Sequence, residues 1–215
     1  MTPKIAVFFD GGGVLFDDMC LKMLLESIHQ VHGDSFTQED HQRLVQTKAK
    51  VWKQYETRVI SEREFWSYIL KHTPALSHES VTSLVKKIRT TRMIPFYGTI
   101  SIAQDLRKDG HFVGVISNHS VDWFNFVWSK FELQLVFPKE NVVTSFDVKT
   151  AKPDEKIFLY AKKIALDAGF PSPFFVDDKL LNVETATKLG FQGVHFDSRK
   201  DNHLVLRQKL GMSLP

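Results

Sequence analysis

Short apolar runs occur near the start of the chain and again in its second half, and each has the length of a strand. They lie at residues 4–9, 111–117, 141–146, 174–178 and 193–196. The first, KIAVFF, ends at an acidic residue followed by three glycines, and the run HFVGVIS is rich in residues that favour β structure. The pattern therefore predicts a strand at each of these five places.

Amphipathic stretches separate the predicted strands in the second half of the chain. Helices are predicted over about 122–131, 155–169 and 180–190, and the last two end at Gly169 and Gly190. Strands that alternate with helices are typical of a parallel sheet with crossover helices. In such sheets ligands bind beyond the carboxyl ends of the strands. We therefore predict an α/β fold and expect the functional residues at those ends.

Residues 17–94 carry no strand signal and predict helices throughout. The segment CLKMLLESIHQVHG predicts a helix closed by Gly33, and a long helix follows with Thr37 as its N-cap. The apolar stripe of that long helix consists of Leu44, Val51, Trp52, Tyr55 and Val59. Ser61 and Glu64 have the spacing of a capping box, and SHESVTSLVKKIRTTRM predicts one more helix. The chain thus predicts an all-helical block between the first strand and the others.

The composition is that of an ordinary globular protein and excludes several classes. With 215 residues, 43% hydrophobic and 25% charged, the chain is long enough for one large domain or for a core with an insertion. The net charge is +3 and the basic residues are scattered, so we expect no nucleic-acid partner. Cys20 is the only cysteine, which excludes an intramolecular disulfide and a multi-cysteine metal site. The apolar runs are too short for a signal peptide or a membrane span, so we expect a cytoplasmic protein with no membrane partner.

One carboxylate, Asp10, comes directly after the first predicted strand and directly before Gly11, Gly12 and Gly13. Residues without a Cβ let the backbone turn tightly and approach a ligand closely, and successive amides in such a turn can point at an anion. A carboxylate in that place suits a nucleophile beside a phosphate site. The alternative that this segment alone leaves open is a strand followed by a loop with a solvated aspartate.

Further polar side chains follow the later strands. They are Ser117, Asn118, Asp177 and Asp178 at two strand ends, and Lys152 in the loop after the third predicted strand. Carboxylates crowded at one edge repel one another unless a cation intervenes, and an all-oxygen site with two or three carboxylates fits Mg²⁺. Lys152 and the Ser117 hydroxyl would then serve an anion. A carboxylate nucleophile, a divalent cation, a lysine and a hydroxyl together indicate phosphoryl transfer through an aspartyl-phosphate.

Four segments of the chain resemble, in order, the four motifs of the haloacid dehalogenase-like (HAD) hydrolase superfamily. They are FFDGGGVLFD, VISN, KPDEKIF and FFVDDKLLNVETATKLGFQGVHF. The resemblance covers residues 4–17 and about 94–200, and the helical block lies where this family carries its C1 cap. It implies the C1-capped phosphatase subgroup. The implied fold is a Rossmann-like parallel sheet core, residues 1–16 and 95–215, with helices on both faces. Residues 17–94 would form an inserted all-helical cap.

The resemblance also implies a role for each residue at the predicted edge. Asp10 would be the nucleophile and a ligand of Mg²⁺, together with the backbone carbonyl of Gly12. Asp178 would be the principal metal ligand, and Asp177 would bind the metal directly or through water. Ser117, Asn118 and Gly11 would hold the phosphoryl group, and Lys152 would neutralise its charge. Asn182, one turn along the following helix, would orient Asp178 or a bound water.

The sequence departs from the family pattern at Gly12, where phosphatases of the superfamily usually carry a second aspartate as general acid and base. His119 is a candidate for that role, and Asp17, Asp18 and His29 are weaker ones. Without the aspartate, substrates with a good leaving group would be favoured. No motif in the helical block indicates the substrate or an oligomeric state.

We predict a Mg²⁺-dependent phosphomonoester hydrolase that acts on a small phosphorylated metabolite through an aspartyl-phosphate. Two alternatives remain open at the level of the sequence. One is a non-catalytic or regulatory binding protein of the same fold, in which Gly12 marks lost chemistry. The other is a 2-haloacid dehalogenase, which needs no metal and would leave the Asp177–Asp178 pair unexplained.

Overall fold

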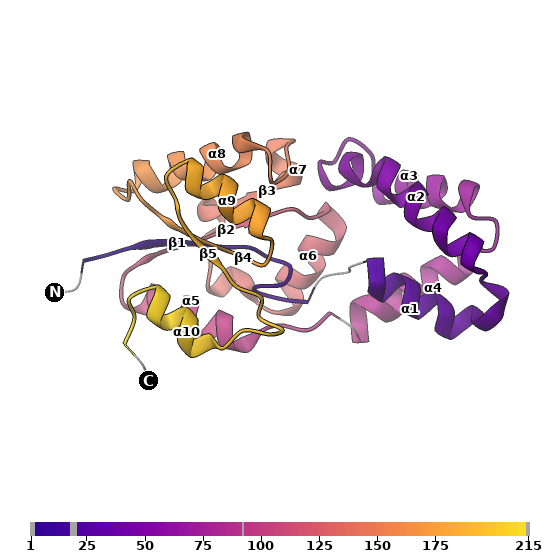
Figure 1. The fold of residues 1–215 in the computed structure, drawn as a ribbon, viewed down its shortest axis with the longest axis horizontal. Helices are drawn as coiled ribbons and strands as arrows, with labels where there is room; N and C mark the ends of the chain where they lie inside the picture. Colours follow the sequence, from indigo (N-terminus) through magenta and orange to yellow (C-terminus); the bar gives the residue numbers. More distant parts are fainter. Residues whose placement is uncertain (1–2, 18–20, 92, 214–215) are drawn as a thin grey trace.

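The computed structural model describes residues 3–17, 21–91 and 93–213. Within them five strands form a single parallel sheet in the order β3-β2-β1-β4-β5 (Figure 1). The strands are β1 (Ala6–Phe9), β2 (Phe112–Ser117), β3 (Val142–Thr144), β4 (Phe174–Asp177) and β5 (Gln192–His195). Because β1 lies between β2 and β4, the residues that follow these three strands are neighbours at one edge of the sheet.

Helices cover the sheet and form a separate block beside it. The core helices are α5 (Tyr97–Lys108), α6 (Val121–Lys130), α7 (Ser145–Val148), α8 (Glu155–Asp167), α9 (Leu180–Lys188) and α10 (His203–Lys209). The block contains α1 (Leu21–His32), α2 (Gln38–Glu56), α3 (Glu62–His72) and α4 (His78–Thr91). Single 3₁₀ turns lie at Gly33–Ser35, Leu133–Leu135 and Lys139–Asn141. Among the described residues, no helix combines the length and the hydropathy that crossing a bilayer requires.

The strands β2, β1 and β4 at the centre of the sheet are buried on both faces, which explains why their sequences are almost continuously apolar. Val7 and Phe9 of β1 point into the cluster that includes side chains of α5, α6 and α10. Ala6 and Phe8 point into the opposite cluster, built with side chains of α8 and α9. Figure 1 shows α8 and α9 on one side of the sheet and α5 and α10 on the other. The predicted α/β fold, with a parallel sheet and helices on both faces, is confirmed.

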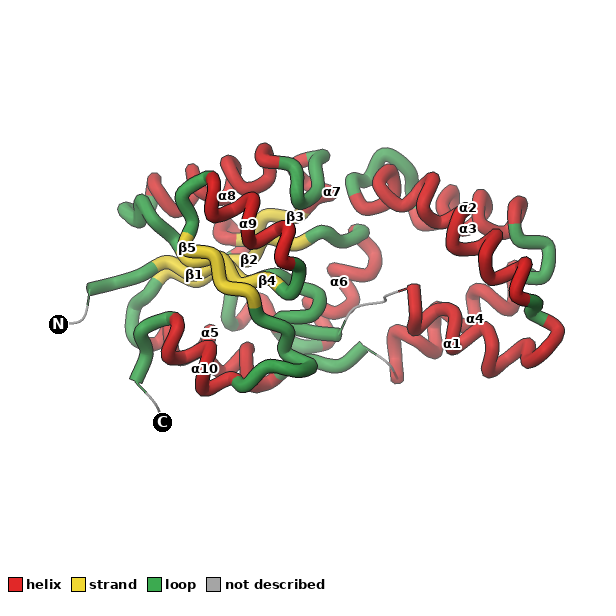
Figure 2. The backbone as a smooth tube through the Cα atoms, in the orientation of Figure 1, coloured by secondary structure: helices red, strands yellow, loops and turns green. Residues whose placement is uncertain are grey.

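The helical block stands at the carboxyl edge of the sheet and is joined to the core by two adjacent segments (Figure 2). The backbone N–H of Asp17 donates to the carbonyl of Ile94 at 2.8 Å, and Phe96 donates to Leu15 at 2.9 Å. The chain therefore leaves and re-enters the core at almost one place, close to the predicted boundaries 16/17 and 94/95. The assignment of residues 17–94 as a cap domain stays a prediction, and we return to it below.

The helix starts in the block follow the local signals of the sequence. Thr37 and Ser61 cap α2 and α3, and both capping boxes are complete, with Asp40 and Glu64 as the reciprocal partners. The predicted stripe on α2 is wrong at Val59, which is exposed. The helix ends at Glu56 and the chain then turns, so Val59 no longer follows the helical period.

The core differs from the predicted elements at three places. The predicted strand 141–146 ends at Thr144, because Ser145 and Phe146 begin the short helix α7. Helices α5 and α10 were not among the predicted elements. Ser145 matters for the site, because its hydroxyl bonds to backbone groups on two other segments.

Candidate active site

Asp10 lies at the carboxyl end of the central strand, and its carboxylate is buried and fixed. Its backbone N–H donates to the carbonyl of Val176 at 2.8 Å, which continues the pairing of β1 with β4. Its Oδ1 accepts from the backbone N–H of Gly11 at 2.6 Å and lies 2.7 Å from Nζ of Lys152. Asp10 is only 5% exposed. The structure thus confirms that Asp10 is not a solvated loop aspartate.

Lys152 brings together groups from three strands. Besides Asp10, its ammonium donates to Oδ2 of Asp177 at 2.7 Å and to the carbonyl of Ile116 at 2.8 Å. The side chain of Asn118 holds the lysine's backbone, because its Nδ2 donates to the Lys152 carbonyl and its Oδ1 accepts from the Lys152 N–H. The Asn118 side chain thus positions Lys152 in this structure, and its expected help in binding a phosphoryl group stays a prediction.

Asp177 is completely buried and fully engaged. Its carboxylate accepts from Lys152, from the backbone N–H of Lys179 at 2.8 Å, and from Nδ2 of Asn182, which lies 3.0 Å from each oxygen. Asn182 was expected to orient Asp178 or a bound water. In this structure the first turn of α9 directs the Asn182 amide towards Asp177, and its expected role at Asp178 or a bound water stays a prediction.

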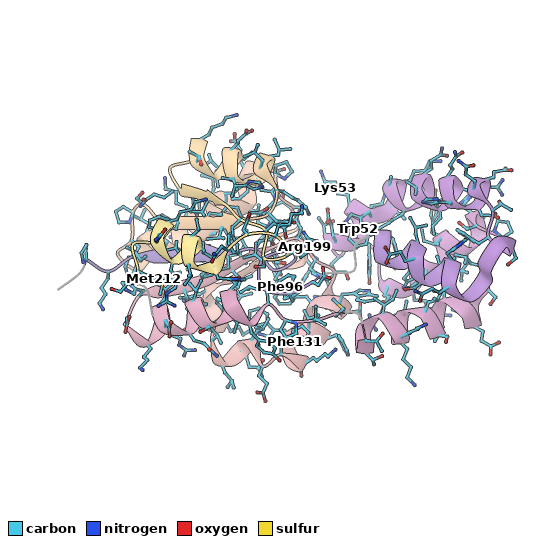
Figure 3. The ribbon with its side chains drawn as sticks, turned by 60° about the horizontal axis from the view of Figure 1, so that its bottom comes forward. Trp52, Lys53, Phe96, Phe131, Arg199 and Met212 are labelled. Carbon is cyan, nitrogen blue, oxygen red and sulfur yellow. The ribbon has the colours of Figure 1, made fainter. Side chains whose placement is uncertain are left out.

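Asp178 points to the other side of the site and pairs with a residue outside the predicted set. Nη2 of Arg199 lies 2.7 Å from its Oδ2, and the same guanidinium reaches Asp197 at 2.8 Å and Asp17 at 3.7 Å. Figure 3 shows Arg199 at the edge of the core that faces the helical block. Arg199 follows the end of β5, so the rule that places site residues beyond the strand ends also points to it.

Three carboxylates, those of Asp10, Asp177 and Asp178, each offer an oxygen within 4.8 Å of the others. Burial and then the Asp177 charge raise the pKa of Asp10, and Lys152 opposes the shift. A small divalent cation among these oxygens would offset the repulsion, and an all-oxygen set is what Mg²⁺ prefers. At Gly13, with φ of +81°, an added Cβ would lie 2.4 Å from Oδ2 of Asp178, so the turn packs closely on the carboxylates. The residues present fit Mg²⁺.

The hydroxyl of Ser117 is the second feature that indicates a ligand site. It is buried at the end of β2, and its Oγ has no hydrogen-bond partner among the described residues. An added Cβ on Gly11 would lie 2.6 Å from that Oγ, which places the hydroxyl against the turn that follows Asp10. A buried hydroxyl without a partner is costly, and an oxygen of a bound anion would satisfy it.

Residues 7–195 match the family model described as haloacid dehalogenase-like hydrolase. The chain belongs to the haloacid dehalogenase-like hydrolase family. Comparison with curated protein sequences gave no match.

Solved structures of HAD proteins share the whole fold. A HAD family enzyme from Bacteroides thetaiotaomicron is 22% identical, with a TM-score of 0.73 over 95% of this chain and 98% of that one. The same enzyme in complex with magnesium and inorganic phosphate has a TM-score of 0.68 at 22% identity, over 93% and 97% of the two chains. A HAD-like family hydrolase from Porphyromonas gingivalis is 19% identical, with a TM-score of 0.68 over 98% and 99%. A dehalogenase has a TM-score of 0.62 at 16% identity over 94% and 88%. These likenesses support the fold of the HAD core and of the helical insertion.

The candidates for a general acid in this HAD protein lie in different settings. The ring of His119 is buried between Phe16 and Phe124, with centroid distances of 5.8 and 6.3 Å. Asp17 lies beside Arg199. His29 is exposed on α1, and Asp18 lies outside the described residues.

Gly12 lies in the turn after Asp10, where it forms a bridge with Phe16. The structure thus gathers Asp10, Lys152, Asp177 and Asp178 with the Ser117 hydroxyl nearby. Arg199 also lies at this edge of the sheet, and it was not among the residues predicted from the sequence.

Proposed function

We propose that this chain is a Mg²⁺-dependent phosphomonoester hydrolase of the C1-capped phosphatase subgroup, acting on a small phosphorylated metabolite. The observation that carries the proposal is the buried contact of Asp10 with Lys152 beside two further carboxylates. The hydroxyl of Ser117, which finds no hydrogen-bond partner in the described part of the chain, adds a place for a phosphoryl oxygen. A solved HAD enzyme of the same fold binds magnesium and inorganic phosphate, which supports the same ligands here.

Asp10, Asp178 and the Gly12 carbonyl would hold Mg²⁺, with Asp177 bound directly or through water. When bound, the ion supplies positive charge against the phosphate and the carboxylates. Lys152 supplies a second positive charge at Oδ1 of Asp10, so a dianionic ester can approach the nucleophile. Ser117 and the turn at Gly11 would position the phosphoryl oxygens.

The reaction we propose has two displacements at phosphorus. A carboxylate oxygen of Asp10 forms a bond to phosphorus while the ester P–O bond breaks, and the alcohol leaves with that electron pair and a proton. Water then attacks the phosphorus of the aspartyl-phosphate, which releases phosphate and restores Asp10. Lys152 stays hydrogen-bonded to Oδ1 and orients the carboxylate through both steps.

We propose that the helical block, residues 17–94, is the cap that closes over this site. Figure 3 shows Trp52 and Lys53 at the end of the block nearest to the core. The hydroxyl of Ser145 in the core donates to the carbonyl of Glu56 at 2.6 Å, so the end of α2 already touches the rim. Side chains at this end of α2 would contact the part of the substrate beyond the phosphate.

The test is a phosphate-release screen over a broad panel of phosphate esters, with and without Mg²⁺, on the wild type and Asp10→Asn. We expect Mg²⁺-dependent release by the wild type and none by the variant. Metal-independent halide release from 2-chloropropionate would instead favour the dehalogenase, for which a solved structure of the same fold is a precedent. Mg²⁺ binding without turnover on any ester would favour a non-catalytic binding protein.

A further inference from the structure

The departure of an alkoxide needs a proton, and Gly12 has no side chain to give one. The described acids at this edge of the core already have charged partners or belong to the carboxylate cluster. Asp10, Asp177 and Asp178 form the carboxylate cluster. Asp197 is held in its charged form, because hydrogen bonds from Arg199 and Lys200 outweigh its desolvation and lower its pKa. Asp17 faces the same guanidinium. Among the described residues, we therefore looked for a proton donor on the opposite wall, which the helical block forms.

Glu56 occupies that wall at the last position of α2. Its carbonyl accepts from the hydroxyl of Ser145 at 2.6 Å, and that hydroxyl also accepts from the backbone N–H of His119 at 3.1 Å. His119 follows Ser117 and Asn118 directly in the loop that leaves β2. One serine therefore ties the end of α2 to the loop that lines the phosphate side of the site.

A second observation concerns the charges around this end of α2. The ammonium charge of Lys179 opposes the rise in the pKa of Glu56, and it opposes the rise in the pKa of Asp10 as well. Lys179 follows Asp177 and Asp178 at the end of β4, and its side chain is exposed. Lys53, three residues before Glu56, acts in the same way on Asp154, close to Lys152. This end of α2 therefore faces the active-site edge of the core.

The surroundings of Glu56 favour the protonated carboxyl. The residue is half-buried, and burial raises its pKa. A hydrogen bond from Trp52 and the charges of Lys179, Lys48 and Lys53 oppose the shift without cancelling it. The negative end of the α2 dipole also disfavours a carboxylate at this position.

We propose that Glu56 is the general acid and base of the hydrolysis, supplied by the helical block in place of the side chain absent at Gly12. The inference rests on the proposed phosphatase function and names the residue that completes it. It does not require His119, whose ring lies between two aromatic side chains.

The proton balance is as follows for the two displacements. As Asp10 bonds to phosphorus and the ester P–O bond breaks, the leaving oxygen keeps the electron pair and takes the Glu56 proton. The products of this first displacement are the aspartyl-phosphate, the free alcohol and the Glu56 carboxylate. That carboxylate then takes a proton from water as the water oxygen attacks phosphorus and the bond to Asp10 breaks. Phosphate leaves, and Asp10 and Glu56 return to their starting forms.

The experiment compares kcat/KM for benzyl phosphate and p-nitrophenyl phosphate, which are similar in size and differ in leaving group. Benzyl alkoxide needs a proton to depart, whereas p-nitrophenolate does not, and kcat/KM reports only the steps through that departure. We expect Glu56→Gln to lower kcat/KM for benzyl phosphate by about 10²–10⁴-fold, the usual worth of general acid catalysis. For p-nitrophenyl phosphate the expected change is less than about 3-fold, as no proton is needed. Glu56→Asp should recover part of the benzyl phosphate activity.

The controls separate chemistry from folding. Glu39→Gln removes an exposed carboxyl from the first turn of the same helix and should change neither value. Mg²⁺ titration by calorimetry should give the same affinity for Glu56→Gln as for the wild type. An equal loss on both esters, or no loss on either, would overturn the role of Glu56, as would a wild type that cleaves p-nitrophenyl phosphate alone. A wild type that hydrolyses no ester of the panel would overturn the proposed function itself and the role with it.

Discussion

Nζ of Lys152 lies 2.7 Å from Oδ1 of Asp10, and both side chains are almost completely buried. The two residues are far apart in the sequence: Asp10 follows the central strand β1, and Lys152 lies in the loop before α8. Their contact exists only when β1, β2 and β4 are paired, because Asn118 after β2 and Asp177 after β4 hold the lysine in place. The geometry of the site therefore depends on the pairing of these three strands.

Replacing Lys152 by Met should destabilise the protein strongly. The change leaves the carboxylates of Asp10 and Asp177 buried without their shared cation, and breaking a buried pair costs about 3–5 kcal/mol. The free energy of unfolding in urea, measured without metal, would show the loss. Lys163→Met, which removes an exposed ion pair with Asp167, is the matched control and should cost less than about 1 kcal/mol. Similar values for the two variants would contradict the buried contact.

The metal-free protein should lose stability as the pH rises. The pKa of Asp10 is raised to about 8 in the folded chain from 3.8, by burial first and by Asp177 second. Between these values the folded state binds more protons than the unfolded state, so the free energy of unfolding falls with increasing pH. The melting temperature measured in EDTA should therefore decrease from pH 5 to pH 8. Added Mg²⁺ should raise the melting temperature more at pH 8 than at pH 5.

Asp10→Asn provides the check on that pH dependence, because the amide cannot ionise. Without metal at pH 8, the variant should melt higher than the wild type, and its own decrease between pH 5 and pH 8 should be smaller. An equal decrease in melting temperature in both proteins would mean that groups other than Asp10 cause the pH dependence.

Arg199→Gln should strengthen Mg²⁺ binding. In this structure the guanidinium pairs with Asp178 at 2.7 Å, so it competes with an ion for the charge of that carboxylate. The pair is partly exposed, so its loss should tighten the Mg²⁺ dissociation constant by only a few-fold, in line with about 0.2–1 kcal/mol for such pairs. Calorimetric titration measures this directly, with Arg43→Gln on α2 as the control. Weaker binding would mean that Arg199 instead holds Asp178 in the binding orientation.

The residues at the carboxyl edge of the sheet could be predicted from the sequence, because a simple geometric rule places them. Residues that follow neighbouring parallel strands must lie together, so Asp10, Asp177 and Asp178 could be placed without any side-chain detail. Helix caps at Thr37 and Ser61 were equally readable, because their partners lie three residues away.

The features that were missed depend on packing between distant segments. Arg199 reaches Asp178 with a long side chain from the loop after β5, and only its place beyond a strand end points to it. Asn182 contacts Asp177 because of the way the first turn of α9 leaves β4. Glu56 looks like an ordinary surface residue until the helical block is placed against Ser145.

The central claim is that the Asp10 carboxylate bonds to phosphorus. Its most direct test is acid quenching of the Mg²⁺-loaded enzyme during turnover of p-nitrophenyl phosphate, followed by mass spectrometry of the peptides. A phosphoryl group on the peptide that contains Asp10, present in the wild type and absent from Asp10→Asn, is the predicted result. Turnover at the wild-type rate by Asp10→Asn, or a phosphoryl group on another residue, would contradict it.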